Sequence, residues 1–306
     1  MKLMRKRVLL AAGAMVAMSR MALAGPPTTS LQFRTAKPAP PPSLGERLAA
    51  AFTDPQLLLY LGFTLLATAL FLMSRGKVRR WARWGMLLSS LAVLGFYFGG
   101  CPCPVGSATK LGQIFTNPVA YLVPFILFLI PTLVALFVGR IFCGWVCPLG
   151  AVQEVLGFWS RKKSLVPEVI DRRLRYLKYL LLMGLVALAI LGVRFHWVIY
   201  DPFKVMFTGT GTWIAIGLAA FFGVLSLVIY RPWCRYVCPL GAVLALASVV
   251  GMAPKKADPK KCVGCALCAR ACPLDAIRIR NGEAYFTSEC IRCGDCSAVC
   301  RHDALP

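Results

Sequence analysis

Histidine and the common cofactor-binding motifs are scarce in this chain of 306 residues. The two histidines are His196 and His302, and His302 lies near the C-terminal end, so the paired histidines that a b-type haem needs are absent. There is also no C-x-x-C-H motif, no G-x-G-x-x-G motif opening a helix and no P-loop. These absences exclude recognisable sites for haem, dinucleotides and nucleoside triphosphates.

Acidic residues are also few. The chain has 12 Asp and Glu against 35 Lys and Arg, a formal net charge of +23, which in a soluble protein would suggest nucleic-acid binding. However, 58% of the residues are hydrophobic, the mean hydropathy is +0.68, and no interleaving of basic and aromatic residues is visible. The composition therefore predicts an integral membrane protein whose basic residues collect in cytoplasmic loops, and no nucleic-acid partner.

Residues 1–24 have the pattern of a signal peptide. Basic residues at Lys2 and Arg5 to Arg7 precede a short apolar stretch, and Ala22-Leu23-Ala24 forms an A-x-A-type cleavage site. An uncleaved signal anchor is the alternative interpretation. Residues 25–55 are rich in proline and predict a partly extended linker outside the cytoplasm.

Five apolar segments are long enough to cross a bilayer, which takes about 20 residues. They are residues 56–74, 81–100, 119–138, 177–193 and 212–230. Arg83, near the end of the second segment, is expected to snorkel toward water. A shorter apolar segment, residues 239–253, predicts a helix at the membrane face.

The charge of the loops predicts the orientation. The loops after the first and third segments are rich in Lys and Arg, whereas those after the second and fourth hold few. The positive-inside rule places the rich loops in the cytoplasm, and an odd number of spans then leaves the C-terminal end there too. We therefore expect a multi-pass protein of a bacterial inner membrane.

Eight of the 14 cysteines form two C-x2-C-x2-C-x3-C runs near the C-terminal end, which is the spacing that holds two [4Fe–4S] clusters. In two-cluster ferredoxins the last cysteine of each run binds the other cluster. The first cluster is expected on Cys262, Cys265, Cys268 and Cys300, and the second on Cys290, Cys293, Cys296 and Cys272. Zinc binding and disulfides are the alternatives, but zinc ribbons use paired C-x2-C knuckles and a cytoplasmic domain keeps its thiols reduced.

Two further cysteine pairs share the pattern C-x3-C-P-L-G-A-V: Cys143 with Cys147, and Cys234 with Cys238. On a helix this spacing would put both thiols of a pair on one face, and the proline can begin the next helix. The four thiols would converge on a metal or cluster, or cycle between dithiol and disulfide; structural thiols at a helix break are the alternative.

Two other groups are weaker candidates. Cys101 and Cys103 form a C-x-C pair that fits no standard ligand run, and an oxidisable pair or a partner contact are both open interpretations. His196 and Asp201 lie among aromatic residues at the outer ends of two spans. These residues either belong to the interfacial belt or lie near a quinone.

At these motifs the chain resembles the NapH/MauN-type family of ferredoxin-like membrane proteins, over roughly residues 85–306. The resemblance is carried by both four-cysteine runs, by Arg140-Ile-Phe-Cys143-Gly-Trp-Val-Cys147-Pro148, and by Trp233-Cys234-Arg-Tyr-Val-Cys238-Pro239. It implies four membrane helices, C-x3-C-P motifs facing the cytoplasm, two [4Fe–4S] clusters, and transfer of electrons from quinol toward periplasmic redox partners. NosR-type proteins, in their C-terminal region, and CcoG are similar in the same motifs. The segment 56–74 and the Cys101/Cys103 pair depart from the NapH pattern.

The expected fold class is an α-helical membrane protein with about five transmembrane helices, residues 56–253, and a cytoplasmic α+β two-cluster ferredoxin-like domain, residues 254–306. Its expected function is electron transfer between the quinone pool or a cytoplasmic donor and a periplasmic redox system, as a quinol dehydrogenase-like subunit working with other redox subunits. A maturation factor that reduces a metal or disulfide for another enzyme, and a redox sensor, are the alternatives. The sequence does not identify the donor, the acceptor or the direction of flow.

Overall fold

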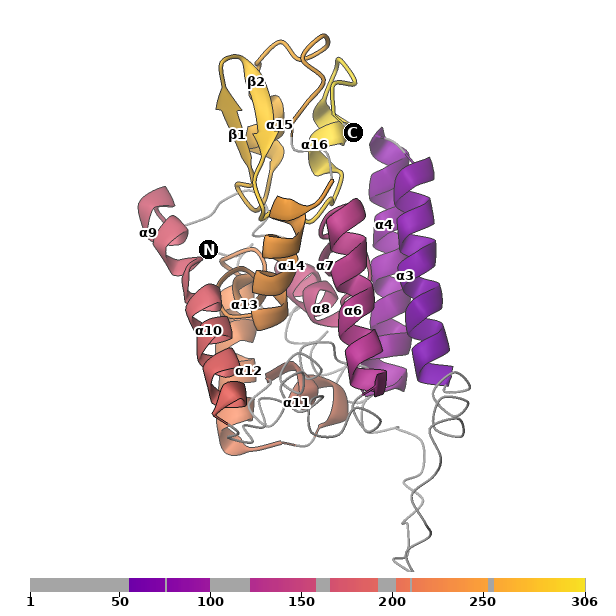
Figure 1. Cartoon of the computed structure of the whole chain (residues 1–306), viewed down its shortest axis with the longest axis vertical. Coiled ribbons are helices and arrows are strands. Elements are labelled where there is room, and N and C mark those ends of the chain that lie inside the picture. Colours follow the sequence, from indigo (N-terminus) through magenta and orange to yellow (C-terminus); the bar gives the residue numbers. More distant parts are fainter. Residues whose placement is uncertain are drawn as a thin grey trace, which may run out of the picture.

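The computed structural model describes residues 55–74, 76–99, 122–157, 166–191, 202–209, 211–252 and 256–305. A body of helices carries a small C-terminal domain at one end (Figure 1). The predicted order, a helical body followed by a small α+β domain, is confirmed. The expected signal peptide and all but the last residue of the expected linker lie outside the described residues.

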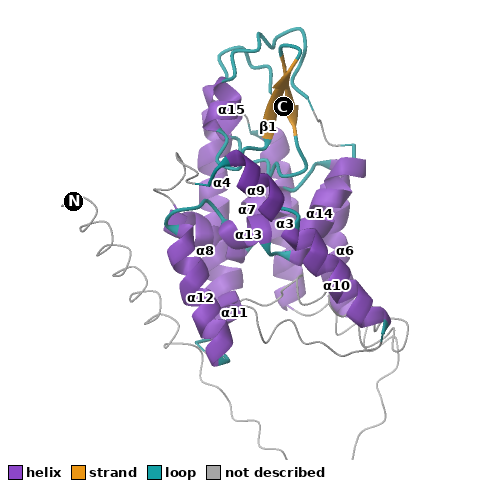
Figure 2. Ribbon diagram, turned by 90° about the vertical axis from the view of Figure 1, so that its left-hand side faces the viewer, coloured by secondary structure: helices purple, strands orange, loops and turns teal. Residues whose placement is uncertain are grey.

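Helices occupy each of the five segments that were expected to be spans (Figure 2). They are α3 (Pro55–Met73), α4 (Gly76–Ser90) continued by the π-helix η1 (Leu91–Tyr97), α6 (Leu122–Phe137), α10 (Leu177–Ile190) and α12 (Trp213–Ser226). Two short helices, α9 (Glu168–Leu174) and α11 (Pro202–Thr208), precede α10 and α12. Within the described ranges, α3 alone is long and apolar enough to cross a bilayer, so the five-span topology stays a prediction.

The C-x3-C-P motifs form two helix–break–helix units. These units are α7 (Ile141–Trp145) with α8 (Pro148–Leu156), and α13 (Pro232–Tyr236) with α14 (Pro239–Val250). Cys147 and Cys238 lie at the breaks with nearly the same backbone angles (φ −64° and −63°, ψ 113° and 114°), because a residue before proline is driven to extended backbone. Each proline then begins the next helix, as predicted, but the two cysteines of a motif do not share one continuous helix.

Helix α14 is packed more deeply than its sequence suggested. Its first half is buried against α6 and α10, while Leu246, Val249 and Val250 near its end are exposed. The backbone N–H of Met252 also donates to the carbonyl oxygen of Leu136, at the end of α6, at 2.8 Å. The expected helix over residues 239–253 is therefore present, with its first half buried in the body; its place at the membrane face stays a prediction.

A buried carboxylate joins both repeats to α4. Glu154, on α8, is fully buried and pairs with Arg83 of α4 and with Arg231, which lies just before α13. Arg231 has left-handed backbone (φ 52°), which is costly for a residue with a side chain, and the two ion-paired contacts fix it there. The prediction that Arg83 snorkels toward water is wrong, because Glu154 and the carbonyl oxygen of Gly144, 2.9 Å from Arg83 Nε, supply buried partners.

The C-terminal domain is built on one β-hairpin between two short helices. Strand β1 (Ile277–Arg280) pairs antiparallel with β2 (Glu283–Phe286), and Ile277 lies opposite Phe286. Asn281 and Gly282 join the strands with φ values of 50° and 77°, the two left-handed residues of a type I′ turn. Helices α15 (Leu267–Ala271) and α16 (Asp295–Val299) each lie within one cysteine run and pack against each other.

The substitution Glu154→Gln tests the buried ion pairs. It leaves two buried guanidinium groups without their counter-ion, so we expect unfolding in detergent to be easier by about 3–5 kcal/mol. Thermal unfolding of the purified protein measures this, with Asp258→Asn, at an exposed carboxylate of the C-terminal domain, as the matched control. An equal effect of both substitutions would contradict the assigned role of Glu154.

Candidate functional site

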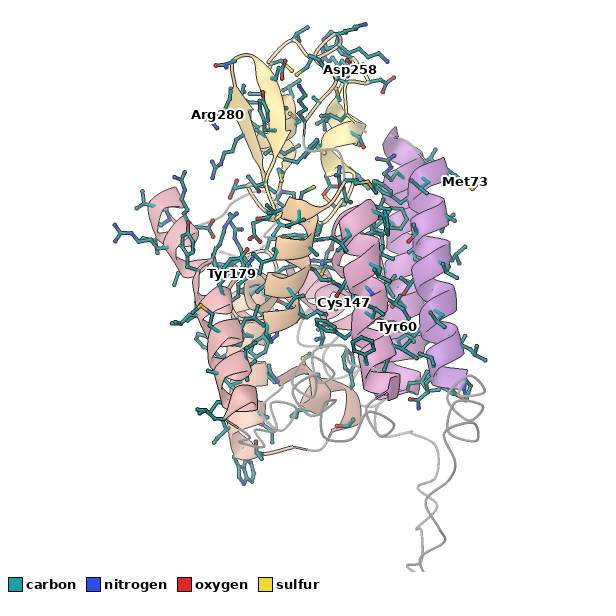
Figure 3. The ribbon with its side chains drawn as sticks, in the orientation of Figure 1. Tyr60, Met73, Cys147, Tyr179, Asp258 and Arg280 are labelled. Carbon is teal, nitrogen blue, oxygen red and sulfur yellow. The ribbon has the colours of Figure 1, made fainter. Side chains whose placement is uncertain are left out.

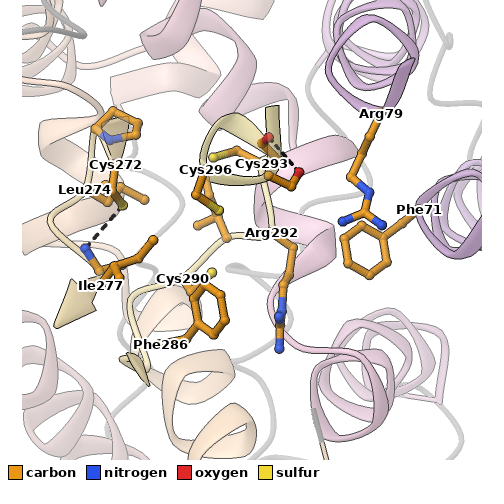
Figure 4. Close-up of a pocket in the computed structure, with 15 residues that line it drawn as sticks. Phe71, Arg79, Cys272, Leu274, Ile277, Phe286, Cys290, Arg292, Cys293 and Cys296 are labelled. Atoms are coloured by element: carbon orange, nitrogen blue, oxygen red, sulfur yellow. Dashed lines mark hydrogen bonds between the residues drawn. The ribbon is translucent and has the colours of Figure 1, made fainter. Parts of the chain in front are cut away.

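Four cysteines line one cavity where the C-terminal domain meets the helical body (Figure 4). Three of them, Cys290, Cys293 and Cys296, come from the second run, and Cys272 is the last cysteine of the first run. Phe71 of α3 and Arg79, next to α3 on α4, close the cavity from the side of the body. We call this space the inner cavity.

A second cavity lies within the C-terminal domain and is lined by the remaining four cysteines of the runs. These are Cys262, Cys265, Cys268 and Cys300. The cavity also contacts Ile279 of β1 and His302, and Cys265 is exposed to solvent. We call this space the outer cavity, because it lies on the domain's own residues and away from the helical body.

The two cavities group the thiols in the crossed pattern that the sequence predicts, three cysteines of one run with the last of the other. All eight are free thiols. In the part of the chain that the structure describes, no three Cys, His, Asp or Glu side chains are close enough to hold a single metal ion. Thiols spread around a cavity suit a cluster, in which each thiolate binds a different iron atom, so the donor set fits [4Fe–4S] clusters. Ligation by these residues stays a prediction.

The two runs have the same backbone. Residues with left-handed backbone occur at three matching positions of the two runs. The position before the second cysteine holds Gly264 and Arg292 (φ 69° and 54°), and the position after it holds Ala266 and Gly294 (φ 60° and 82°). The third position, three residues after the last cysteine, holds Asp275 and Asp303 (φ 48° and 45°). Such backbone is unfavourable for residues with side chains and persists where the surroundings impose it. The repeated conformation indicates that both runs are shaped to wrap around the same kind of group.

The thiols of the inner cavity are more enclosed than those of the outer one. Burial raises the pKa of Cys272 to about 11, although the backbone N–H of Ala276 donates to its sulfur at 3.3 Å. Burial, followed by the proximity of other thiols, also raises the pKa of Cys296 well above its usual value. A metal cluster bound here would supply the positive charge that stabilises the thiolate forms of these cysteines.

Glu289 attaches the inner cavity to the helical body. Its carboxylate, next to Cys290 in sequence, pairs with Arg140 at 3.1 Å and with Lys178 of α10. Arg140 Nη1 also donates to the carbonyl oxygen of Ser288 at 3.0 Å. Burial would raise the pKa of Glu289, but the charges of Arg140 and Lys178 outweigh it and hold that pKa below its usual value. The ion-paired carboxylate therefore fixes the start of the second run.

Each repeat contacts a different loop of the inner cavity. In the first, Trp145 Nε1 donates to the carbonyl oxygen of Arg292 at 3.1 Å, and Gly144 lies so close to Ile291 that a Cβ would be 2.1 Å from its carbonyl oxygen. In the second, Arg235 donates to Asp171 at 2.6 Å and to Asp275, after Cys272, at 3.1 Å. The inner cavity thus lies across both repeats.

Asp171 joins the second repeat to α9. Tyr236 donates to Asp171 Oδ1 at 2.6 Å, and Arg175 donates both to Asp171 and, at 2.9 Å, to the carbonyl oxygen of Leu274. Burial would raise the pKa of Asp171, but hydrogen bonds from Arg235 and Tyr236 lower it further than burial raises it. The carboxylate therefore stays charged at neutral pH and holds the loop after Cys272.

The other candidates have different outcomes. The structure brings Cys143, Cys147, Cys234 and Cys238 into the centre of the body, with Cys143 and Cys238 buried. Cys101, Cys103, His196 and Asp201 lie outside the described residues, so their roles stay predictions. Sequence reasoning missed Glu289, Arg79 and the pairing of Arg140. An acidic residue directly before a cysteine run, in a chain with 12 acidic residues, was the available signal for Glu289.

Family models for iron–sulfur proteins match the chain in three places. A model described as a 4Fe-4S binding domain matches residues 121–167 and again residues 210–256, the two C-x3-C-P repeats with the helices before them. A model described as a 4Fe-4S dicluster domain matches residues 254–301, which contain both four-cysteine runs. The predicted iron–sulfur character of the C-terminal region is therefore confirmed.

Curated relatives share these regions. An uncharacterized protein of Methanocaldococcus jannaschii is 34% identical over 183 residues, covering 58% of this chain and 68% of the relative. The ferredoxin-type protein NapH of Escherichia coli is 30% identical over 189 residues, 58% of this chain and 64% of NapH. The methylamine utilization ferredoxin-type protein MauN of Methylobacillus flagellatus is 32% identical over 145 residues, 45% of this chain and 50% of MauN. No solved structure matches the chain.

Gly144→Ala tests the contact between body and domain. The added methyl group would lie 2.1 Å from the carbonyl oxygen of Ile291, so the loop from Glu289 to Gly294 must move away. We expect amide hydrogen exchange in this loop to become about tenfold faster or more, since local opening costs less free energy. Gly184→Ala on α10, where no atom lies within 4 Å, is the matched control. Unchanged exchange in both variants would show that this contact does not hold the loop.

Arg79→Gln tests the charge beside the inner cavity. Arg79 is 5% exposed, its guanidinium lies 4.4 Å from the centre of the Phe71 ring, and its side chain borders Gly294. A nearby positive charge favours the reduced, more negative cluster, so its loss should lower one reduction potential by on the order of 50 mV, about 1 kcal/mol. Redox titration monitored by EPR measures this. Arg80→Gln, at an exposed position on the same helix, should leave both potentials unchanged.

Proposed function

Since this chain belongs to the NapH/MauN-type family of ferredoxin-like proteins, we propose that it is a membrane-bound subunit that links the quinone pool or a cytoplasmic donor to a periplasmic redox system. Iron–sulfur electron transfer is the activity common to this proposal and to the family. The finer assignments are two [4Fe–4S] clusters in the C-terminal domain, residues 254–306, and a membrane domain, residues 56–253.

The different exposure of the two thiol groups carries the proposal. The outer cavity has an exposed cysteine, Cys265, whereas the inner cavity is closed by Phe71 and Arg79 of the helical body. Clusters held there would supply one-electron transfer. The cysteines would place one cluster near solvent and the other near the helical body. The outer thiols would face a soluble partner, and the inner thiols would face the helices. This arrangement supports a relay between solvent and membrane.

An apolar outer surface supports placement of the body in a bilayer. Large hydrophobic side chains are exposed along α3, α10 and α12, among them Leu65, Met73, Leu180, Trp213 and Val224, and Figure 3 shows Met73 directed outward at the end of α3. The charged residues Arg83, Glu154 and Arg231 are instead buried between helices. A protein in water would favour the reverse distribution, whereas lipid favours this one. We place the C-terminal domain on the cytoplasmic side of a bacterial inner membrane, as the loop charges predict.

The buried ion pairs would give the relay its rigidity. Glu289 between Arg140 and Lys178, and Asp171 beneath Arg235, hold the loops that carry Cys290 and Cys272. Electron transfer needs donor and acceptor at fixed separation, and these contacts keep the inner thiols against the body. Other redox subunits and a quinol are the proposed partners, since the chain lacks recognisable motifs for a catalytic cofactor of its own.

Maturation of another enzyme is the second candidate function. The free thiols of the two C-x3-C-P motifs favour it, because paired thiols can reduce a metal or a disulfide; they are Cys143, Cys147, Cys234 and Cys238. In that case these cysteines would cycle between dithiol and disulfide. In electron transfer through clusters they would not.

EPR of anaerobically purified protein distinguishes these functions. Dithionite should generate signals of two [4Fe–4S] clusters, and a quinol analogue should reduce at least one of them. Cys265→Ala, in the outer cavity, should remove one signal and leave the other. Clusters that dithionite reduces but quinol does not, even with membranes from the source cells added back, would refute the quinol link. Loss of thiol labelling at the C-x3-C-P cysteines on oxidation would favour maturation.

A further inference from the structure

The two C-x3-C-P repeats face each other across the centre of the body. Gly150 of the first repeat contacts Arg231, which precedes the second, and a Cβ on Gly150 would lie 2.7 Å from Arg231 Nη1. Gly241, the matching residue of the second repeat, contacts Arg140, which precedes the first, and a Cβ there would lie 3.3 Å from Arg140 Nη2. The exchange is reciprocal, so the repeats form a pseudo-symmetric pair that shares one interior.

The four thiols lie within this shared interior. Cys147 is drawn inside the body in Figure 3, and all four are free thiols. Arg231 Nη1 donates to the carbonyl oxygen of Cys143 at 2.5 Å, so the residue that precedes the second repeat contacts a cysteine of the first. A Cβ on Gly150 would lie 3.1 Å from the carbonyl oxygen of Cys143, and one on Gly241 would lie 3.3 Å from that of Cys234, so both cysteine-bearing segments line the same interior.

Hydrogen-bond donors and cations surround the sulfur atoms. Gln153 Nε2 donates to Cys234 Sγ at 3.2 Å, and the backbone N–H of Gly241 donates to Cys238 Sγ at 3.4 Å. Gln153 Oε1 also accepts from the backbone N–H of Trp233 at 2.9 Å, so the first repeat positions the cysteine of the second. Donors to sulfur, together with the cations Arg140 and Arg231 close by, are the surroundings that stabilise bound thiolates.

The donor set at this place fits an iron–sulfur cluster. Four cysteine thiolates from two repeats are soft donors, the kind that iron–sulfur clusters bind. The model described as a 4Fe-4S binding domain matches each repeat, residues 121–167 and 210–256, and each match holds two of the four cysteines. We propose that Cys143, Cys147, Cys234 and Cys238 together hold a third [4Fe–4S] cluster, bridging the two repeats beneath the inner cavity.

The site completes the relay, and in this respect the inference rests on the proposed function. Helix α7, which contains Cys143, contacts the loop from Cys290 to Cys293, and helix α13, which contains Cys234, contacts the loop after Cys272. Transfer of one electron between a cluster at the repeat thiols and a cluster in the inner cavity would oxidise one and reduce the other. No bond would be made or broken. The outer cavity, the inner cavity and the repeat thiols would then form a single path into the body.

Iron and acid-labile sulfide per chain test the proposal in anaerobically purified full-length protein. We expect about 12 of each in the unmodified chain, and about three spins per chain by EPR after full reduction. Cys147→Ala with Cys238→Ala should reduce iron to about eight per chain and keep both C-terminal signals, which also shows that the variant is folded. Cys265→Ala with Cys268→Ala, the matched pair in the outer cavity, should also leave about eight but remove a different signal.

The outcomes separate this inference from the proposed function. About eight iron atoms in the unmodified chain, unchanged by Cys147→Ala with Cys238→Ala, would overturn the third cluster and leave the C-terminal ones. Zinc or copper in place of the last four iron atoms, or a disulfide between these cysteines, would overturn it as well. About 12 iron atoms with no reduction by quinol would support the site while removing the quinol link. If the double variant loses all iron, the test is the spin count of the fully reduced, unmodified chain. About three spins per chain would support the third cluster, and a lower count would overturn it.

Discussion

The Glu289 carboxylate, held between Arg140 and Lys178, is the contact on which the rest of the arrangement depends. It lies next to Cys290 and so connects the second cysteine run to the helical body. Arg140 in turn contacts Gly241 of the second repeat while it precedes the first. One arginine therefore joins the C-terminal domain and both C-x3-C-P motifs. Because all these groups are buried, loss of any partner would leave an uncompensated charge, which costs several kcal/mol.

The described helices of the body bury several charged side chains and expose many large apolar ones. Glu154 pairs with Arg83 and Arg231, Asp171 pairs with Arg175 and Arg235, and Glu289 completes the set on the side of the domain. Each carboxylate serves at least two cations, which fits a chain with few acidic residues and many basic ones. The positive-inside rule explains the excess of arginine in the loops. Some arginines have a second role: Arg79, Arg140 and Arg231 place positive charge beside the cysteine thiols. Positive charge near a cluster favours its reduced state.

Much of this arrangement could be predicted from sequence, and the remainder could not for identifiable reasons. The cysteine spacing predicted the crossed grouping of Cys272 with the second run, because that spacing is local and is set by the ligand. The apolar segments predicted where helices lie, although only α3 passes the length and composition test for a span. Long-range pairs were beyond reach: Arg83 and Glu154 are 71 residues apart, and Arg140 and Glu289 are 149 apart. Gly144, whose lack of a side chain admits Ile291, could not be distinguished from other helical glycines by pattern alone.

Iron anomalous scattering from crystals of the anaerobically purified protein tests the central claim most directly. The account predicts iron within the cavity lined by Cys272, Cys290, Cys293 and Cys296, against Phe71 and Arg79, with further iron in the outer cavity and between the repeats. Iron in a C-terminal domain separated from Arg140, Lys178 and Trp145 would contradict it. So would a cluster bound by the four cysteines of a single run.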